Sequence, residues 1–129
     1  MLAAVFQALT LLVTGSLEAE AAALTPREKA ALVVVSGTPA PPGVGGVFLH
    51  GPSARAPQGA LVLVDQEGGA VKDLPALPPW RAARDHRTAA GARASGQETG
   101  RALRRAGVHV NLAPVLDAAG GPLGSRHFR

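Results

Sequence analysis

The sequence contains no cysteine and no tyrosine, and it has only one tryptophan and three phenylalanines among 129 residues. Without cysteine, neither a disulfide framework nor a thiolate metal site can form, and redox chemistry gives no indication of the compartment. Apolar residues still make up 47% of the chain, but most of them are Ala, Val and Leu. We therefore expect one small domain whose core consists mainly of small side chains.

Patterns typical of metal, phosphate and nucleic-acid sites are also missing. The four histidines show no H-x-x-x-H spacing, and the glycines of residues 43–46 lack the Lys-Ser/Thr of a phosphate loop, so we expect no metal and no cofactor. Residues 81–105 contain seven arginines against two acidic residues. This charge suits nucleic acid, but Trp80 is the one aromatic residue nearby that could stack a base. The preferred interpretation is a solvated, arginine-rich helix face, with no nucleic-acid partner.

The first 24 residues differ in composition from the rest of the chain. Leu2–Val13 is an apolar run that is too short to span a membrane, and residues 19–21 (Ala-Glu-Ala) form a small-x-small cleavage pattern. A signal peptide also needs a basic start, yet no Lys or Arg precedes Arg27. Residues 1–24 are therefore interpreted as a signal peptide or as a disordered, frayed or wrongly started terminus. A secreted and a cytoplasmic protein both remain open.

The central stretch of the sequence joins an apolar run to two carboxylates and a glycine pair. Ala60–Val64 has the length and branched side chains of a strand buried on both faces. Asp65, Glu67 and the glycines 68–69 follow it directly. A buried parallel strand with this ending places its carboxylate at the edge of a sheet or barrel where α/β proteins bind ligands. The alternative is an ordinary polar turn.

Before this stretch, the pattern predicts one short helix and two strands. Thr25 and Glu28 flank Pro26 in a capping box, which starts the helix. Residues 32–35 and 45–49 are the two expected strands. The loops that follow them are short and rich in Pro and Gly, and they contain no helical pattern. Parallel neighbours usually need a helical crossover of a dozen or more residues, so parallel pairing is strained here and the direction of these strands stays open.

After this stretch, the pattern predicts one longer helix and one more strand. The apolar stripe of the helix consists of Thr99, Ala102, Leu103 and Ala106, and Gly107 ends it. Residues 108–113 then alternate as a strand, in which His109 is expected to face a packed layer. Strand, helix and strand from residue 60 to residue 113 form one βαβ unit.

Five motifs, in order, resemble the amino-terminal part of glycoside hydrolase family 3, and most closely its bacterial β-N-acetylhexosaminidase branch. They are L-T-P-R-E-K (24–29), G-G-V-F-L (45–49), D-Q-E-G-G-A-V (65–71), G-V-H-V-N-L-A-P-V-L-D (107–117) and R-H-F (126–128). The resemblance covers about residues 24–129. It implies an α/β fold, a (β/α)₈ TIM barrel of which residues 25–129 form roughly the first half.

The resemblance also implies a function and a sugar site. The family hydrolyses O-glycosyl bonds with retention, and this branch acts on terminal β-linked N-acetylglucosamine, often in peptidoglycan fragments. Asp65 matches the aspartate that binds sugar hydroxyls in the −1 subsite, and Arg126 matches an arginine that contacts the same sugar. A carboxylate accepts such hydrogen bonds and a guanidinium donates several. Asp117 matches an aspartate expected to support this edge of the barrel.

The sequence departs from the family pattern in several places. Ala70 replaces a basic residue, and R-H-F-R stands where the family has R-S-F-G. The expected acid/base, within a His-Asp pair, and the aspartate nucleophile have no counterpart in residues 1–129, so no catalytic residue is assigned and these residues alone are expected to be inactive. The alternatives are a β-glucosidase of the same family, a non-catalytic carbohydrate-binding remnant and, third, a basic nucleic-acid-binding domain. An incomplete barrel is also expected to be partly unfolded or to self-associate through its last strand.

Overall fold

We describe a computed structural model of the chain, which covers residues 16–51, 55–117, 121–123, 126 and 128. The chain divides into two compact units, residues 1–33 and 34–129, and each is described by itself. Much of the predicted signal peptide (residues 1–15) lies outside the described residues, and the predicted cleavage pattern at residues 19–21 falls within a helix. No helix in the described part of the chain is long and apolar enough to cross a membrane.

The first unit contains two short helices, α2 (Leu17–Ala23) and α3 (Pro26–Ala31). The predicted capping box is confirmed at the start of α3. The Thr25 hydroxyl accepts a hydrogen bond from the Glu28 backbone N–H (3.3 Å), and the Glu28 carboxylate accepts one from the Thr25 N–H (2.8 Å). The hydrogen bonds from the Thr25 side chain and backbone lower the pKa of Glu28. Local sequence alone therefore fixes where this helix begins.

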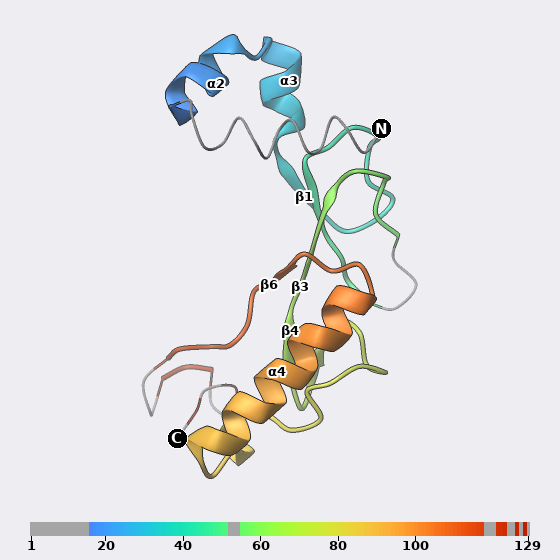
Figure 1. The fold of residues 1–129 in the computed structure, drawn as a ribbon. Coiled ribbons are helices and arrows are strands. Elements are labelled where there is room, and N and C mark those ends of the chain that lie inside the picture. The colour runs from blue at the N-terminus through green and yellow to red at the C-terminus, as the bar shows by residue number, and fades with distance from the viewer. Residues whose placement is uncertain (1–15, 52–54, 118–120, 124–125, 127, 129) are drawn as a thin grey trace. The chain divides into compact units, whose positions relative to one another are not determined.

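The second unit is built on a four-stranded parallel sheet with the order β1-β2-β3-β6 (Figure 1). Helix α4 connects β3 to β6, which confirms the predicted βαβ unit. The mixed α/β class is thus as predicted. The strands of this sheet are β1 (Val34–Ser36), β2 (Gly46–Phe48), β3 (Leu61–Val64) and β6 (Val110–Asn111), and α4 spans Ala89–Arg105.

The first three strands pair in parallel through short connections, which answers the question of strand direction that the sequence left open. Residues 37–45 connect β1 to β2, and residues 49–60 connect β2 to β3. Just beyond each strand the chain bends at a glycine with a positive φ, Gly37 (83°) and Gly51 (86°). Glycine adopts this conformation without steric cost. The chain therefore turns sharply after each of these two strands, and no helix occurs among the described residues of either connection.

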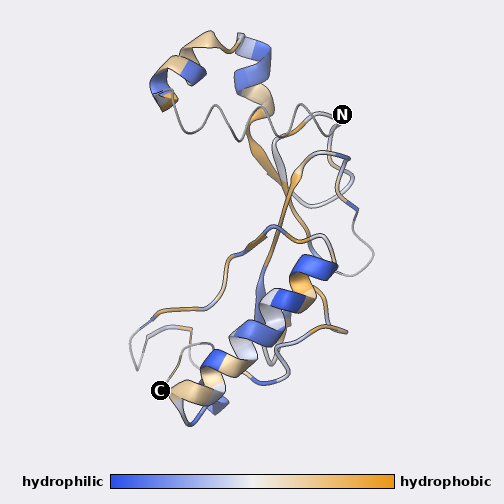
Figure 2. Cartoon of the chain, viewed as in Figure 1, coloured by the Kyte–Doolittle hydropathy of each residue, from blue (hydrophilic) through white to orange (hydrophobic). Residues whose placement is uncertain are grey.

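The two faces of the sheet are buried to different extents. The core consists of Val47, Leu49, Ala60 and Val64 from the strands and their flanks, together with Leu103 of α4. On the opposite face, Val34, Leu61 and Val110 remain 50%, 51% and 36% exposed. The prediction that residues 60–64 are buried on both faces is therefore wrong, because α4 covers only one side of β3. Figure 2 shows the hydrophobic colouring of β1 and β3.

Helix α4 buries the stripe predicted for it, with one exception. Thr99, Ala102 and Leu103 are buried, whereas Ala106 is exposed because it is the C-cap residue and lies past the packed part of the helix. Gly107 follows with φ of 78°, as predicted for a C′ residue. The arginines of α4 are all exposed, so the solvated arginine-rich face is confirmed. Hydrophilic residues recur along the visible side of α4 in Figure 2.

Two predicted strands have shifted or shorter bounds. The expected strand at residues 32–35 is observed as β1 at Val34–Ser36, and the expected strand at 108–113 pairs only over Val110–Asn111. His109 does not face a packed layer, which corrects that prediction. Its ring is exposed, and Nδ1 accepts a hydrogen bond from the Val62 backbone N–H (2.9 Å). The His109 ring therefore contacts the backbone of β3 rather than the core.

A short antiparallel hairpin and a single 3₁₀ turn lie between β3 and α4. They are β4 (Gln66–Gly68), β5 (Val71–Lys72) and η1 (Ala83–Asp85). The hairpin begins immediately after Asp65, so the chain changes direction where the parallel strand β3 ends. This change of direction brings a group of polar side chains together at the C-terminal end of the sheet.

Candidate functional site

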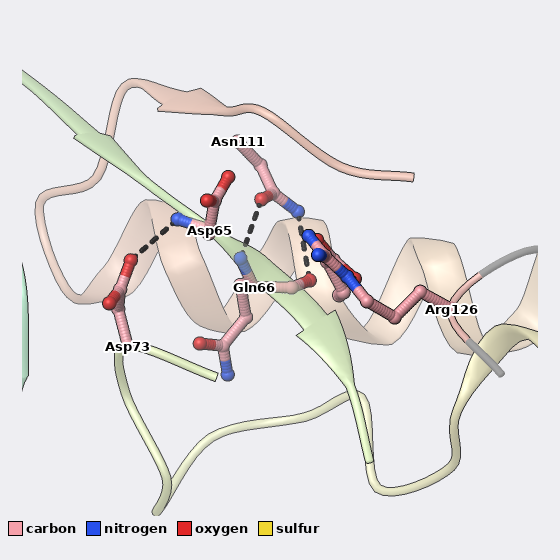
Figure 3. A network of polar contacts seen from close by, with 6 residues as sticks. Asp65, Gln66, Asp73, Asn111 and Arg126 are labelled. Atoms are coloured by element: carbon pink, nitrogen blue, oxygen red, sulfur yellow. Dashed lines mark hydrogen bonds and ion pairs between the residues drawn. The ribbon is translucent and has the colours of Figure 1, made fainter. Parts of the chain in front are cut away.

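The polar side chains at this end of the sheet form a connected group, which we call the polar cluster (Figure 3). It comprises Asp65, Gln66, Glu67, Asp73, Asn111 and Arg126. Two hydrogen bonds join the residues that flank the hairpin, Asp65 before β4 and Asp73 after β5. The Asp65 N–H donates to Asp73 Oδ2 (2.6 Å), and the Asp73 N–H donates to the Asp65 carbonyl (3.1 Å). Asp65 is therefore held by its backbone, which leaves its side chain available.

Gln66 and Asn111 connect the ends of β3 and β6. The Gln66 N–H donates to Asn111 Oδ1 (3.0 Å), and Asn111 Nδ2 donates to the Gln66 carbonyl (3.2 Å). The Gln66 side chain is 1% exposed, and it exchanges hydrogen bonds with the backbone of residues 74–78. Every polar atom of Gln66 therefore has a partner. These contacts fix the backbone between Asp65 and Glu67.

Glu67 and Arg126 form a two-point ion pair. Arg126 Nε donates to Glu67 Oε2 (2.8 Å), and a terminal nitrogen of the guanidinium contacts Oε1. The Glu67 side chain is 6% exposed, and that of Arg126 is 36% exposed. The hydrogen bond from Arg126 to Glu67 is the main cause that raises the pKa of Arg126, and the charges of Glu67, Asp65 and Asp117 act in the same direction. Asp117 thus lies near Arg126, at the edge that the resemblance expects it to support.

Asp65 differs electrostatically from its neighbours. Burial raises the pKa of its carboxyl group, and the charges of Asp73 and Glu67 raise it further, while Arg126 and His50 oppose the shift. Within the described part of the chain, no hydrogen bond to the Asp65 carboxylate oxygens is observed. Glu67 and Asp73 both accept hydrogen bonds. Asp65 is therefore the partly desolvated, unpaired carboxylate of the cluster.

We expect Asp65→Asn to stabilise the protein at neutral pH. Since folding raises the pKa of Asp65, the ionised carboxylate lowers the free energy of unfolding once the pH exceeds the folded-state pKa. Below the pKa of an unfolded aspartate, about 3.9, both states bind the proton and the gain should vanish. Urea unfolding at pH 7 and at pH 3 measures the difference.

The exposed Asp85 of η1 provides the matched control for this measurement. Asp85→Asn should leave the urea midpoint nearly unchanged at both pH values, because exposed charges contribute little to stability. If Asp65→Asn instead lowered the midpoint at pH 7, the Asp65 carboxylate would have a stabilising partner and the description above would be wrong.

A pocket of about 360 Å³ opens between α4 and the ends of β4 and β6. Its lining includes Gln66, Glu67, His86, Asn111 and Phe128. The space is comparable with that of small-molecule sites and is lined mainly by apolar surface. Among the described residues, no group of three or more His, Asp or Glu side chains is placed to hold a metal ion. Asp65 and Arg126 do not line this pocket; the polar groups that do include the Glu67 carboxylate and the amides of Gln66 and Asn111.

The structure brings together both residues that the sequence analysis assigned to the sugar site. Asp65 directly follows β3, and Arg126 lies close enough that its charge lowers the pKa of Asp65. The guanidinium, however, hydrogen-bonds Glu67. Gln66, Asp73 and Asn111 were not predicted from the sequence, and only Gln66 carried a signal, as a polar residue just past the apolar run that ends at Val64. No family model matches the chain, and no curated protein or solved structure shows significant similarity to it.

Proposed function

We propose that the chain belongs to a family 3 β-N-acetylhexosaminidase and that its polar cluster binds a terminal β-linked N-acetylglucosamine. The observation that carries this proposal is the unpaired Asp65 carboxylate at the C-terminal end of a parallel sheet. Sugar hydroxyls donate hydrogen bonds to such a carboxylate, and a guanidinium nearby complements it. In α/β proteins, ligands bind at this end of the strands.

The arrangement of the strands supports the barrel that this proposal implies. The strands lie side by side in chain order, β1-β2-β3-β6, and all are parallel. A (β/α)₈ barrel adds its strands in this way, whereas a doubly wound sheet reverses the order at a switch point. The face opposite α4 exposes Val34, Leu61 and Val110. In a barrel, apolar side chains on that face would fill the interior.

One observation favours binding without cleavage by these residues. A retaining glycosidase needs an acid/base and a nucleophile whose carboxyl groups lie about 5 Å apart across the scissile bond. Glu67 is paired with Arg126, and Asp73 accepts a backbone hydrogen bond. Of the three carboxylates in the polar cluster, only Asp65 is left to act, and its proposed role is to hold the sugar. A carbohydrate-binding role is therefore the second candidate.

We expect the Asp65→Ala variant to bind N-acetylglucosamine about 10- to 100-fold more weakly than the unaltered protein. A hydrogen bond to a charged group contributes roughly 1.5–3 kcal/mol, and about 1.4 kcal/mol corresponds to a factor of ten. NMR titration with N-acetylglucosamine and with glucose measures the affinities and separates the hexosaminidase and glucosidase alternatives. Release of nitrophenol from a nitrophenyl N-acetyl-β-glucosaminide measures cleavage.

Asp85→Ala serves as the control, since Asp85 is an exposed carboxylate outside the cluster. It should bind the sugar as tightly as the unaltered protein. Binding without nitrophenol release supports the carbohydrate-binding alternative, and tighter binding of glucose supports the glucosidase. An affinity unaffected by Asp65→Ala would remove Asp65 from the sugar site.

A further inference from the structure

Two further side chains, Ser36 and His50, lie in a row with Asp73 of the polar cluster. Ser36 is the last residue of β1, His50 lies two residues beyond β2, and Asp73 directly follows β5. Ser36 Oγ lies 2.8 Å from His50 Nε2, and His50 Nδ1 lies 3.8 Å from Asp73 Oδ1. A hydroxyl, an imidazole and a carboxylate are thus ordered as nucleophile, base and orienting acid.

Strand register places Ser36 and His50 together. Ser36 is the direct neighbour of Phe48 in the parallel pairing of β1 with β2. His50 comes two residues after Phe48, and its ring contacts the Phe48 ring edge-on, with centroids 4.4 Å apart. The phenyl ring therefore supports one side of the imidazole and directs Nε2 toward the Ser36 hydroxyl.

The carboxylate of Asp73 is held in place by a hydrogen bond from the backbone. Asp73 Oδ2 accepts the Asp65 N–H (2.6 Å), so Oδ1 is the oxygen that faces His50. The Asp73 side chain is 14% exposed, against 52% for His50. This order of burial suits the roles, because a buried, hydrogen-bonded aspartate orients the imidazole while the serine stays accessible. Ser36 is exposed.

We infer that Ser36, His50 and Asp73 hydrolyse carboxylic esters through an acyl intermediate on Ser36. A serine hydroxyl is a weak nucleophile unless an adjacent base accepts its proton. When Ser36 Oγ donates to Nε2, the ring proton lies on Nδ1, facing Asp73, and the carboxylate stabilises this tautomer. The 3.8 Å separation exceeds a hydrogen bond. Rotation of the half-exposed His50 ring brings Nδ1 within hydrogen-bond distance of Asp73 Oδ1, because such contacts shorten when substrate binds.

The reaction has two balanced steps. Ser36 Oγ attacks the ester carbonyl carbon and its proton passes to His50 Nε2; the bond to the alcohol oxygen then breaks, and the alcohol leaves with that proton. Water next attacks the acyl group and gives a proton to Nε2. The bond between the acyl group and Ser36 breaks, Oγ recovers the proton, and a carboxylic acid leaves. Asp73 remains ionised throughout. Because Ser36 and His50 are exposed, the substrate class is an ester with a short, unhindered acyl group such as acetyl.

Labelling with a fluorophosphonate, followed by peptide mass analysis, tests the nucleophile. The unaltered protein should be labelled at Ser36, and Ser36→Ala should not be labelled. His50→Gln and Asp73→Asn should react at least tenfold more slowly. His109→Gln is the matched control, since it alters another exposed histidine and should react at the unaltered rate.

Turnover of nitrophenyl acetate separates this inference from simple imidazole catalysis. An exposed histidine acting alone would keep its activity in Ser36→Ala. If Ser36 is the nucleophile, that variant should lose most of the turnover. Retention of activity in that variant, or absence of label at Ser36 in folded protein, overturns the inference.

A second variant tests the base without any substrate. Because the chain contains no cysteine, Ser36→Cys introduces a single thiol beside His50. A neighbouring base that accepts the proton favours the thiolate, which is the reactive form. Alkylation by iodoacetamide at pH 7 should therefore be at least fivefold faster in Ser36→Cys than in Ser36→Cys combined with His50→Gln. Circular dichroism checks that both variants are folded, and equal alkylation rates overturn the role of His50.

Discussion

Replacing Gln66 by alanine is expected to lower the free energy of unfolding by at least about 3 kcal/mol. The carboxamide is 1% exposed, and its Nε2 donates to three carbonyls, those of Leu74 (2.9 Å), Leu77 (3.1 Å) and Pro78 (2.9 Å). Its Oε1 accepts the Leu74 N–H (3.0 Å). Each buried polar group left without a partner costs about 1–3 kcal/mol. Urea unfolding followed by circular dichroism measures the loss.

Two variants separate hydrogen bonding from other causes. Gln97→Ala makes the same chemical change on the exposed side of α4, and it should alter stability by no more than about 0.5 kcal/mol. Gln66→Met keeps most of the side-chain volume but none of its hydrogen bonds, so it should lose nearly as much stability as Gln66→Ala. Recovery of stability in the methionine variant would show that packing is the cause.

Gly68→Ala is expected to have a comparable effect, of more than about 3 kcal/mol. Gly68 is buried and has φ of 102°, where an L-residue is strained by roughly 1–3 kcal/mol. A Cβ atom there would also lie 2.2 Å from the Arg81 carbonyl oxygen and 2.9 Å from Pro79 Cγ. A backbone oxygen cannot move away without displacing its own segment. Thermal and urea unfolding of the variant measure the cost.

Gly59→Ala isolates the contribution of this close approach. Gly59 has a similar φ of 86°, but a Cβ atom there would meet nothing within 4 Å. The variant should therefore lose only the conformational part of the free energy. The difference between the two variants gives the cost of the contact with the segment at Arg81. Equal losses would show that this contact is unimportant for the fold.

Local features of the fold could be predicted because their causes lie close together in the chain. Thr25 and Glu28 are three residues apart and form the predicted capping box. The spacing of apolar residues gave the buried side of α4, and Gly107 gave its end. Asp65 was assigned to the end of a strand for the same reason, since an apolar run stands directly before it.

The connections within the site could not be predicted in this way. The side chain of Gln66 is satisfied by backbone carbonyls of residues 74–78, and no side-chain pattern marks a segment that offers its backbone. The contact between Ser36 and His50 depends on the register of β1 and β2. That register is parallel, and the sequence left the direction of these strands open, so the residues could not be placed side by side from sequence.

The order of the strands also determines when the polar cluster can be completed as the chain folds. The pairs β1–β2 and β2–β3 close over residues 37–45 and 49–60, whereas β3–β6 closes over residues 65–109. Each doubling of a loop's length adds about 0.6 kcal/mol to the entropy cost of closing it, and distant contacts form more slowly. Gln66 and Asn111 can exchange their hydrogen bonds only after β6 has docked. The polar cluster is therefore completed only when the longest-range pairing in the sheet has formed.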